Sequence, residues 1–299
     1  MKTTVTWVFV GVLVLLGGQP DAAGAGGHFA ADKRSSLQQA RVVDRYVALG
    51  DSYTAGAGIP PASPSGCFRS ARNYPARVAE RLSRRTEVVD VSCGAATTSN
   101  AESAQTTFAS NPPQLSQVDA RADLVTVSLG VNDAGFASLF SQCPALAAYD
   151  PMGAPCRASF QTPTGDLLLA GVHAVRERLA RVLEEVQTRA PRAQVLLVGY
   201  PQPVPESGTC AQLPLAAGDY AYAREFFVAL DASMRLAARD AGATYIDVLT
   251  ASRGHDICAG RDAWVLGAGP SGRTAPYHPF AREQRAVAAL VVDAVKSAR

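Results

Sequence analysis

Four short segments of the chain carry groups that together could transfer an acyl group. Ser52 follows Gly50 and Asp51, and its hydroxyl is a candidate nucleophile. His278 lies in a Tyr-His-Pro segment and is a candidate base, and Asn132 offers a side-chain amide. The segment 93–98 offers backbone N–H groups. Acyl transfer needs these kinds of group: a hydroxyl, an imidazole that takes its proton, and N–H donors aimed at the developing oxyanion.

Each of these residues also has a simpler interpretation. A Ser after Gly-Asp is common in turns, and Asn132 could be a turn residue. Among the other histidines, His255 beside Asp256 is the alternative base, whereas His173 lies within a helical pattern. Because all four segments occur together, the sequence favours acyl transfer over four unrelated turns.

Other chemistries lack their sequence context. The segment 267–272 matches G-x-G-x-x-G, but no helix is expected after it, so no dinucleotide site is predicted. Thr54 stands where a G-x-S-x-G elbow needs its second glycine. No C-x-x-C pair exists and the histidines are scattered, so we expect neither a metal nor a cofactor.

Short apolar runs alternate with helical patterns and must position these groups. The runs predict strands at residues 46–49, 87–92, 124–129, 194–198 and 244–248. Apolar spacing predicts helices at residues 74–84, 167–189, 220–241 and 280–295, the third ending before Gly242 as its C-cap. This alternation is typical of a parallel sheet covered on both faces, with ligands beyond the carboxyl ends of the strands. Residues 138–164 are rich in Pro, Gly and Ser and predict an excursion over that edge, where the Ala- and Leu-rich stretch around Cys143 could line an acyl groove.

Composition and the N-terminus suggest an exported globular protein. The 299 residues are 47% hydrophobic and 18% charged, and the net charge of +2 gives no reason to expect nucleic acid as a partner. Lys2, the apolar run 5–16 and Ala23-Gly24-Ala25 predict a signal peptide over residues 1–25, with an uncleaved anchor helix as the alternative. Residues 26–41 are expected to be a mobile leader and residues 42–299 one domain. We therefore expect a secreted, extracellular protein with no stable membrane anchor.

Six cysteines follow the predicted signal peptide. An even number in an exported chain suggests three disulfides, with free buried thiols as the alternative. Spacing alone leaves fifteen pairings open. The cysteines are Cys67, Cys93, Cys143, Cys156, Cys210 and Cys258.

Four sequence blocks resemble the GDSL lipases and esterases of the SGNH hydrolase superfamily, specifically the secreted actinomycete branch. The blocks are ALGDSYTAG at 48–56, CFRSARNYP at 67–75, GVND at 130–133 and HP at 278–279. The resemblance runs from about residue 46 to the C-terminus. The expected fold class is therefore α/β: a three-layer αβα, flavodoxin-like parallel five-stranded sheet in a single domain.

The resemblance also implies roles for individual residues. Ser52 would be the nucleophile, His278 the base, and Ser52, Ala95 and Asn132 the donors of an oxyanion hole. Disulfides in this branch join neighbouring cysteines in order, which implies Cys67–Cys93, Cys143–Cys156 and Cys210–Cys258.

Two positions depart from the family pattern. A further family block usually reads Cys-x-Gly-Ala, and its Gly donates a backbone N–H to the oxyanion. Ala95 stands at that Gly position here; it can still donate its N–H if its φ is negative, and Gly94 is the alternative donor. Ala275 replaces the Asp that usually stands three residues before the His. We therefore expect a Ser-His dyad in which the main-chain oxygen of Ala275 or a close neighbour orients His278. The rival is a carboxylate from Asp256 or Asp262.

The predicted function is that of a secreted carboxylic-ester hydrolase, a lipase or esterase, that acts on a small-molecule or lipid ester through an acyl-serine. We expect it to act as a monomer. A carbohydrate O-deacetylase on the same fold is the alternative. A secreted binding protein with an inactive site is the non-enzyme interpretation.

Overall fold

Parallel strands alternate with helices along the chain, as the apolar runs predict. The computed structural model describes residues 42–64 and 66–297, so the expected signal peptide and leader lie outside the described residues. Five strands form one parallel sheet in the order β2-β1-β3-β6-β7. This is the flavodoxin-like order, and the predicted fold class is confirmed. The strands are β1 Arg45–Gly50, β2 Glu87–Asp90, β3 Leu124–Ser128, β6 Gln194–Val198 and β7 Thr244–Ile246.

Helices fill the connections between the strands, and a two-stranded ribbon precedes the longest of them. The α-helices are α1 Ser52–Ala55, α2 Tyr74–Leu82, α3 Phe136–Ala147, α4 Pro155–Phe160, α5 Leu167–Arg189, α6 Tyr220–Asp240, α7 Val248–Ala251 and α8 Ala281–Ser297. The 3-10 helices are η1 Thr98–Ala101, η2 Gln114–Gln117, η3 Ala217–Asp219 and η4 Gly260–Asp262, and the ribbon pairs β4 Gln161–Thr162 with β5 Gly165–Asp166.

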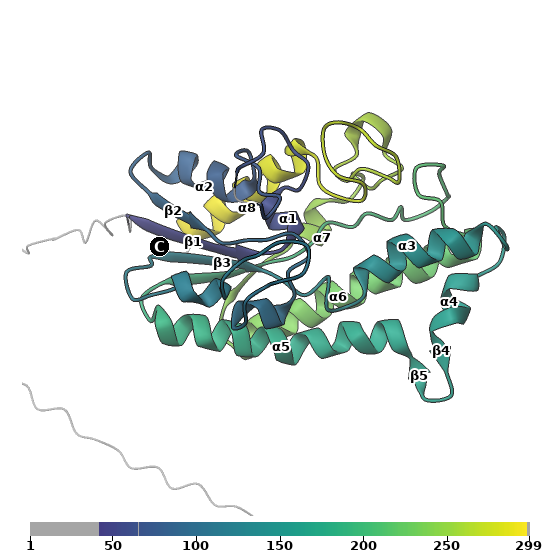
Figure 1. Ribbon diagram of the computed structural model, residues 1–299, viewed down its shortest axis with the longest axis horizontal. Helices are drawn as coiled ribbons and strands as arrows, with labels where there is room; N and C mark the ends of the chain where they lie inside the picture. Colours follow the sequence, from purple (N-terminus) through teal and green to yellow (C-terminus); the bar gives the residue numbers. More distant parts are fainter. Residues whose placement is uncertain (1–41, 65, 298–299) are drawn as a thin grey trace, which may run out of the picture. The chain divides into compact units, whose positions relative to one another are not determined.

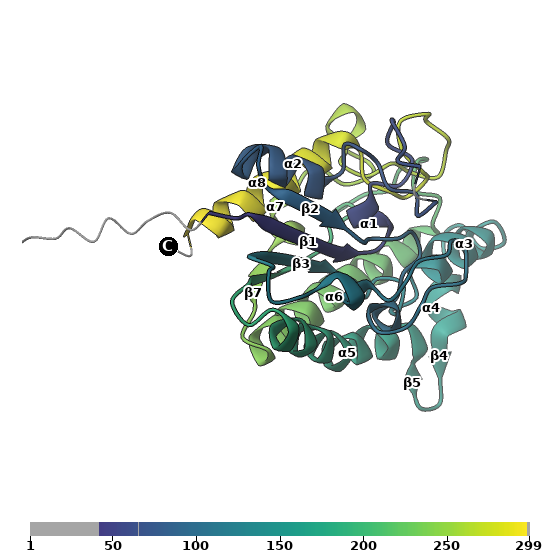
Figure 2. The ribbon, with the colours of Figure 1, turned by 60° about the vertical axis from the view of Figure 1, so that its left-hand side comes forward.

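Three layers result, with the sheet in the middle. Helices α2 and α8 cover one face of the sheet, and α5 and α6 cover the other (Figures 1 and 2). Strand β1 is continuously apolar because both of its faces are buried. Val47 and Leu49 pack with the α5–α6 layer, whereas Tyr46 and Ala48 pack with the α2–α8 layer.

Local sequence signals fix the ends of the principal helices. The Asn73 side chain accepts the N–H of Ala76 and caps α2, and the Asp166 side chain caps α5 in the same way. Gly242 follows the end of α6 with a φ of 67°, a left-handed conformation that glycine adopts without strain. The predicted C-cap is therefore confirmed.

The segment 138–164 differs from its expected irregular form. Helix α3 occupies much of it, with Pro144 inside the helix, and α4 follows. Burial explains the difference, because Leu139, Phe140 and Cys143 of α3 enter the apolar core. The two helices lie beyond the carboxyl ends of the strands in Figure 1.

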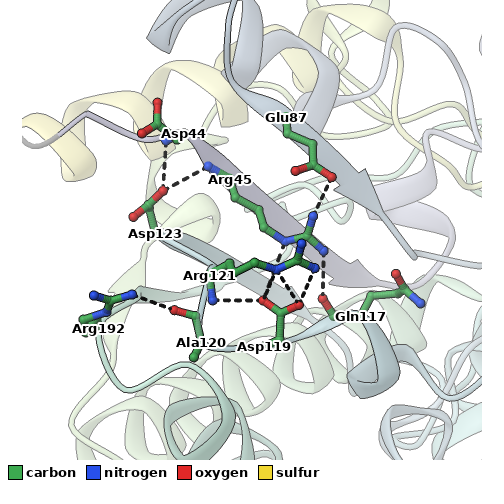
Figure 3. A network of polar contacts seen from close by, with 9 residues as sticks. All are labelled: Asp44, Arg45, Glu87, Gln117, Asp119, Ala120, Arg121, Asp123 and Arg192. Atoms are coloured by element: carbon green, nitrogen blue, oxygen red, sulfur yellow. Dashed lines mark hydrogen bonds and ion pairs between the residues drawn. The ribbon is translucent and has the colours of Figure 1, made fainter.

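A polar network ties together the amino ends of the strands (Figure 3). The Asp123 carboxylate accepts the backbone N–H groups of Asp44 and Arg45, at 2.9 and 3.0 Å. The buried Arg45 guanidinium contacts Glu87 at the start of β2 and lies 3.9 Å from Asp119. These contacts hold β1, β2 and the segment before β3 in register, at the edge of the sheet opposite to the candidate site.

Candidate active site

Ser52 lies at a tight turn between β1 and α1. Asp51 caps the helix, because its Oδ1 accepts the N–H of Tyr53 at 2.9 Å. Gly50 has no room for a side chain, since an added Cβ would lie 2.1 Å from the Thr54 hydroxyl oxygen. The turn thus places the Ser52 side chain just beyond the carboxyl end of a central strand, with 6% of its surface exposed.

The structure brings Ser52 and His278 together across 226 residues of sequence. The Nε2 atom of His278 lies 2.9 Å from the Ser52 Oγ, and its Nδ1 lies 2.7 Å from the main-chain oxygen of Pro276. A carbonyl oxygen only accepts, so Nδ1 carries the proton and Nε2 is free to accept the serine hydroxyl. The Ala275 oxygen instead accepts the backbone N–H of His278 at 3.1 Å, so the carbonyl that contacts the ring is that of its close neighbour Pro276.

The rival carboxylates are engaged elsewhere. The Asp256 carboxylate accepts the N–H of Cys258 at 2.8 Å, and the Asp262 carboxylate lies 3.9 Å from the Arg261 guanidinium. The ring of His255 contacts the main-chain oxygen of Asp262 at 2.8 Å and stacks on Trp264, whereas the ring that contacts Ser52 is that of His278. Among residues 42–64 and 66–297, no carboxylate forms a hydrogen bond or an ion pair with His278.

Burial sets the electrostatics of the histidine. Desolvation lowers the pKa of His278 below its usual 6.5, and the Pro276 carbonyl opposes this shift in part. The imidazole is therefore neutral at pH 7, which is the form that can take a proton from Ser52.

The residue before His278 has a strained backbone that several contacts hold. Tyr277 has a φ of 60°, in the left-handed region that side chains rarely adopt. The hydroxyl of Tyr53 donates to the Tyr277 carbonyl at 2.8 Å, and the Tyr277 N–H donates to Leu266 at 3.0 Å. The Tyr277 ring stacks on Phe140 with centroids 4.5 Å apart. The Tyr53 ring also packs beside the imidazole, with ring centroids 5.6 Å apart.

A buried carboxyl lies beneath this cluster. Asp51 is fully buried, and its Oδ2 accepts the hydroxyl of Tyr200 at 2.6 Å. Burial raises the pKa of Asp51 to about 7, although the hydrogen bonds from Tyr200 and Tyr53 counteract the shift. Both oxygens of Asp51 are occupied by the turn and the core, so its role is to fix the geometry of the turn that carries Ser52.

The loops after β2 and β3 are joined by two side chains. The Asn132 amide donates one hydrogen to the carbonyl of Ala96 at 2.9 Å and keeps a second hydrogen free. The Asp133 carboxylate accepts the N–H and the hydroxyl of Thr98, at 2.8 and 2.6 Å. These bonds fix the orientation of the Asn132 amide, which lines the same cavity as Ser52.

Two backbone N–H groups at the cavity have no hydrogen-bond partner among the described residues, those of Ser52 and Ala95. The alternative donor Gly94 is occupied, since its N–H donates to Cys67 at 3.0 Å. Ala95 has a φ of 63°, so the negative φ that was the condition for its donation is not found; its N–H nevertheless stays available as a donor, because no described residue accepts it. An Ala in this conformation carries strain that Gly would lack, which explains why Gly is the usual residue of the family block.

The cavity beside Ser52 has a volume of about 260 Å³ and a largely apolar wall. Three aromatic rings dominate it, from Phe68, Phe108 and Phe136. Phe68 and Phe108 have φ values of 60° and 65° and are 54% and 78% exposed. Within the described residues, α3 contributes only Phe136 to the wall, so the expected lining by the stretch around Cys143 is wrong.

All six cysteines are paired, in the order that the resemblance implies. Cys67–Cys93 joins the segment after α1 to the segment after β2, next to Phe68 and Gly94. Gly94 leaves space for the Phe68 ring, because an added Cβ would lie 2.6 Å from that ring. The three bridges are Cys67–Cys93, Cys143–Cys156 and Cys210–Cys258.

Sequence reasoning did not assign the aromatic residues of this site. Tyr53 was visible as a departure inside the first block, where many relatives have Leu, and that was a usable signal. Phe68 follows Cys67 in the segment 67–75. Nothing in the sequence near Phe108 or Tyr200 indicates that either lies at the site.

Neither a metal cluster nor a membrane-spanning helix occurs in the part of the chain that the structure describes. No three His, Cys, Asp or Glu side chains there come together in a way that could hold a metal ion. None of its helices is both long enough and apolar enough to cross a bilayer.

Comparisons with known proteins agree with this geometry. The model of the GDSL-like Lipase/Acylhydrolase family matches residues 48–286. Lipase 2 of Streptomyces coelicolor is 36% identical over 256 residues, covering 83% of this chain and 84% of the relative. The crystal structure of phospholipase A1 from Streptomyces albidoflavus superposes with a TM-score of 0.70 at 29% identity, covering 85% of this chain and 99% of that one. The extracellular lipase of Streptomyces rimosus gives a TM-score of 0.64 at 29% identity, covering 85% and 100%.

Proposed function

Because the chain belongs to the GDSL-like Lipase/Acylhydrolase family and is a carboxylic-ester hydrolase, we propose that Ser52 and His278 form its catalytic dyad. The observation that carries this proposal is the pair of contacts made by the imidazole. Nε2 lies 2.9 Å from the Ser52 Oγ, and Nδ1 lies 2.7 Å from the Pro276 oxygen.

The reaction follows from these contacts. The Ser52 Oγ attacks the carbonyl carbon of the ester while its proton moves to the Nε2 of His278. Collapse of the tetrahedral intermediate breaks the bond to the alcohol, which leaves with the proton from Nε2. A water molecule, deprotonated by the same nitrogen, then hydrolyses the acyl-serine and restores the free hydroxyl.

Three donors stabilise the negative oxygen of the tetrahedral intermediate in this proposal. They are the N–H groups of Ser52 and Ala95 and the free hydrogen of the Asn132 amide. All three residues line one cavity. A single donor of this kind contributes roughly 10²–10³ in turnover in other enzymes.

In the proposed dyad, the imidazolium of His278 lies beside the dipole of a carbonyl group, whereas in a catalytic triad it lies beside the full negative charge of a carboxylate. The Pro276 carbonyl fixes the tautomer as well as a carboxylate would, but it stabilises the developing positive charge less. The lowered pKa of the partly buried His278 keeps the neutral base available over a wide pH range, although it also makes the imidazolium costlier to form.

The substrate is an ester with an apolar acyl group. The support for this is the wall of Phe68, Phe108 and Phe136 around the candidate nucleophile. The relatives named as lipase and phospholipase A1 agree with a lipid or lipid-like ester.

Residues 1–25 act as a signal peptide in this proposal, residues 26–41 as a leader and residues 42–299 as the hydrolase domain. The support for export is the signal-peptide pattern, the six paired cysteines and the relative titled an extracellular lipase. The proposed active unit is the monomer, because Ser52, Ala95, Asn132 and His278 of a single chain already line one cavity together. N-terminal sequencing of protein from the culture medium tests the cleavage, and a start at Gly26 is expected.

Replacement of the nucleophile tests the dyad. Ser52→Ala should remove nearly all turnover of p-nitrophenyl esters while leaving the unfolding transition in place. Ser103→Ala makes the same chemical change at an exposed position and should retain activity. A fluorophosphonate probe should label Ser52, and peptide mapping that finds the label on another serine would refute the assignment. A chain-length series of the esters then separates acetyl preference from long-chain preference.

A further inference from the structure

A second cavity lies behind the segment that carries Ala275. It has a volume of about 270 Å³ and four arginines in its wall, Arg72, Arg273, Arg282 and Arg285. We call it the arginine pocket. Its other lining residues are Ile59, Pro60, Phe280 and Ala281.

Only a thin wall separates the arginine pocket from the cavity beside Ser52. The main-chain oxygen of Ala57 accepts the hydroxyl of Thr274 at 3.0 Å and the N–H of Ala275 at 3.1 Å. Ala57 and Ala275 line the cavity beside Ser52, whereas Ile59, two residues after Ala57, and Arg273, two residues before Ala275, line the arginine pocket. A ligand in the arginine pocket would therefore lie next to the proposed catalytic centre.

The guanidinium groups of the pocket have no acidic partners in the part of the chain that the structure describes. Arg273 and Arg282 both contact the ring of the buried Phe280, at 5.1 and 5.4 Å from its centroid. Among the described residues, no carboxylate forms an ion pair with any of the four arginines. The nearest acidic residue along α8, Glu283, is buried and hydrogen-bonded to Gln284.

Further positive charge surrounds the pocket on the adjoining helix. Arg81 of α2 donates to the carbonyl of Arg285 at 3.1 Å, and Arg77 donates to the carbonyl of Arg72 at 2.8 Å. Partial burial, and then the charge of Arg285, lower the pKa of Arg77, although Glu80 opposes this. Helix α8 also begins at Ala281 in the pocket wall, so the positive end of its dipole adds to the same field.

This chemistry selects a multivalent oxyanion. Each guanidinium presents five N–H donors and no acceptor, in a planar fork that matches the oxygens of phosphate. A single carboxylate has two oxygens and one charge and would satisfy one fork, whereas a phosphoryl group can accept from several arginines at once. We propose that the arginine pocket is a binding site for a phosphoryl group, supplied either by free phosphate or by the headgroup of a phospholipid.

Calorimetric titration with sodium phosphate tests the site without using hydrolysis as a readout. At constant ionic strength, the full chain should bind phosphate saturably and should show no such binding with chloride. Arg72→Gln/Arg285→Gln removes two charges without touching the pair that contacts Phe280. It should weaken phosphate binding by about tenfold or more, since charge-assisted hydrogen bonds are lost.

A matched control separates the site from general charge. Arg181→Gln/Arg253→Gln removes two exposed arginines that have no ion pair among the described residues, and phosphate binding should stay within about twofold of wild type. Thermal unfolding by circular dichroism checks that both variants are folded. If the pocket variant proves unfolded, Arg273→Gln/Arg282→Gln serves as the second pocket variant. No saturable phosphate binding, or an equal loss in the pocket and control variants, would overturn the proposal.

Vesicle binding distinguishes the two sources. If the headgroup is the ligand, the wild type should sediment with phosphatidylglycerol vesicles, and free phosphate should reverse this. The pocket variant should then fail to sediment, whereas the control variant should sediment like wild type. Saturable phosphate binding without such sedimentation assigns free phosphate. Both results support a phosphoryl site, and neither depends on the roles proposed for Ser52 and His278.

Discussion

Removal of one hydroxyl group tests how the proposed base is held in place. Tyr53→Phe deletes the hydrogen bond to the Tyr277 carbonyl and keeps the aromatic ring that packs beside His278. The remaining anchors of the turn are the bond from the Tyr277 N–H to Leu266 and the stacking on Phe140. The perturbation is therefore confined to one contact, on a residue whose φ is 60°.

The size of the effect follows from the strain and the lost bond. A left-handed backbone at a residue with a side chain costs about 1–2 kcal/mol, which the contacts of the turn must offset. Loss of the hydrogen bond leaves the carbonyl unpaired and costs about 1–2 kcal/mol. A bias of that size lowers the population of the catalytic geometry by roughly 5- to 30-fold. We expect kcat to fall by that factor with KM within about twofold, because Tyr53 does not line the substrate cavity.

The pH profile distinguishes a loosened turn from a merely destabilised fold. Burial lowers the pKa of His278 in the wild type. A loosened turn admits water to the imidazole, so its pKa should rise toward 6.5 and the acid limb of kcat/KM should move to higher pH. The assay is hydrolysis of p-nitrophenyl butyrate from about pH 5 to about pH 9, a range that spans the ordinary pKa of histidine.

Tyr46→Phe is the matched control. The Tyr46 hydroxyl is fully buried and hydrogen-bonded to Thr126 at 2.8 Å, on the face of the sheet covered by α2 and α8. Its loss should lower stability by a similar amount and leave kcat and the acid limb unchanged. Equal kinetics for Tyr53→Phe and wild type, or equal kinetic losses in both variants, would refute the argument.

Three further substitutions probe the site and its surroundings. Asn132→Ala should lower kcat by roughly 10²–10³, and retention of wild-type kcat for p-nitrophenyl butyrate would exclude the amide as an oxyanion donor. Ala95→Gly relieves a φ of 63° and keeps the N–H, so urea unfolding should show a gain of up to about 1 kcal/mol with kcat within about threefold; a loss of stability would contradict the strain. Glu283→Gln tests a carboxyl whose pKa burial raises from 4.5 to about 8. The folded wild type keeps that proton up to about pH 8 while the unfolded chain releases it above pH 4.5, so wild-type stability should fall across this window. The glutamine variant does not titrate there, so at alkaline pH its free energy of unfolding should exceed that of wild type by at least about 1 kcal/mol. If the stability of both proteins depends on pH in the same way, the buried carboxyl is not the cause.

The centre of each predicted strand was readable from the sequence, whereas several ends were not. Central strands buried on both faces must be continuously apolar, and β6 matches its prediction residue for residue. Strand β2 stops at Asp90, before the predicted end, because that carboxylate turns back to accept the N–H and the hydroxyl of Ser92. Strand β7 stops at Ile246 because Asp247 caps α7. Such side-chain capping depends on local geometry that an apolar pattern does not contain.

At the site, too, some features could be predicted from the sequence and others could not. Types and order of residues indicated which side chains would meet, and Ser52 and His278 do lie in contact. The backbone conformation could not be predicted from the sequence. Ala95 has a positive φ, and the imidazole N–H is accepted by the carbonyl of Pro276 and not by that of Ala275. Both depend on how loops distant in sequence pack together. Helix α3 was missed for a related reason, since its Pro and Ser content masked the burial of Phe140.

The position of the disulfides has a consequence for producing the protein. Each bridge joins segments that follow the carboxyl ends of strands, and the opposite edge relies on the Arg45 network. A host compartment that keeps thiols reduced would thus spare the sheet and remove the link between the Phe68 loop and the Gly94 segment. The soluble yield from such a host would then overstate the amount of competent enzyme. Titration of active sites, rather than protein concentration, is the proper measure of a preparation made there.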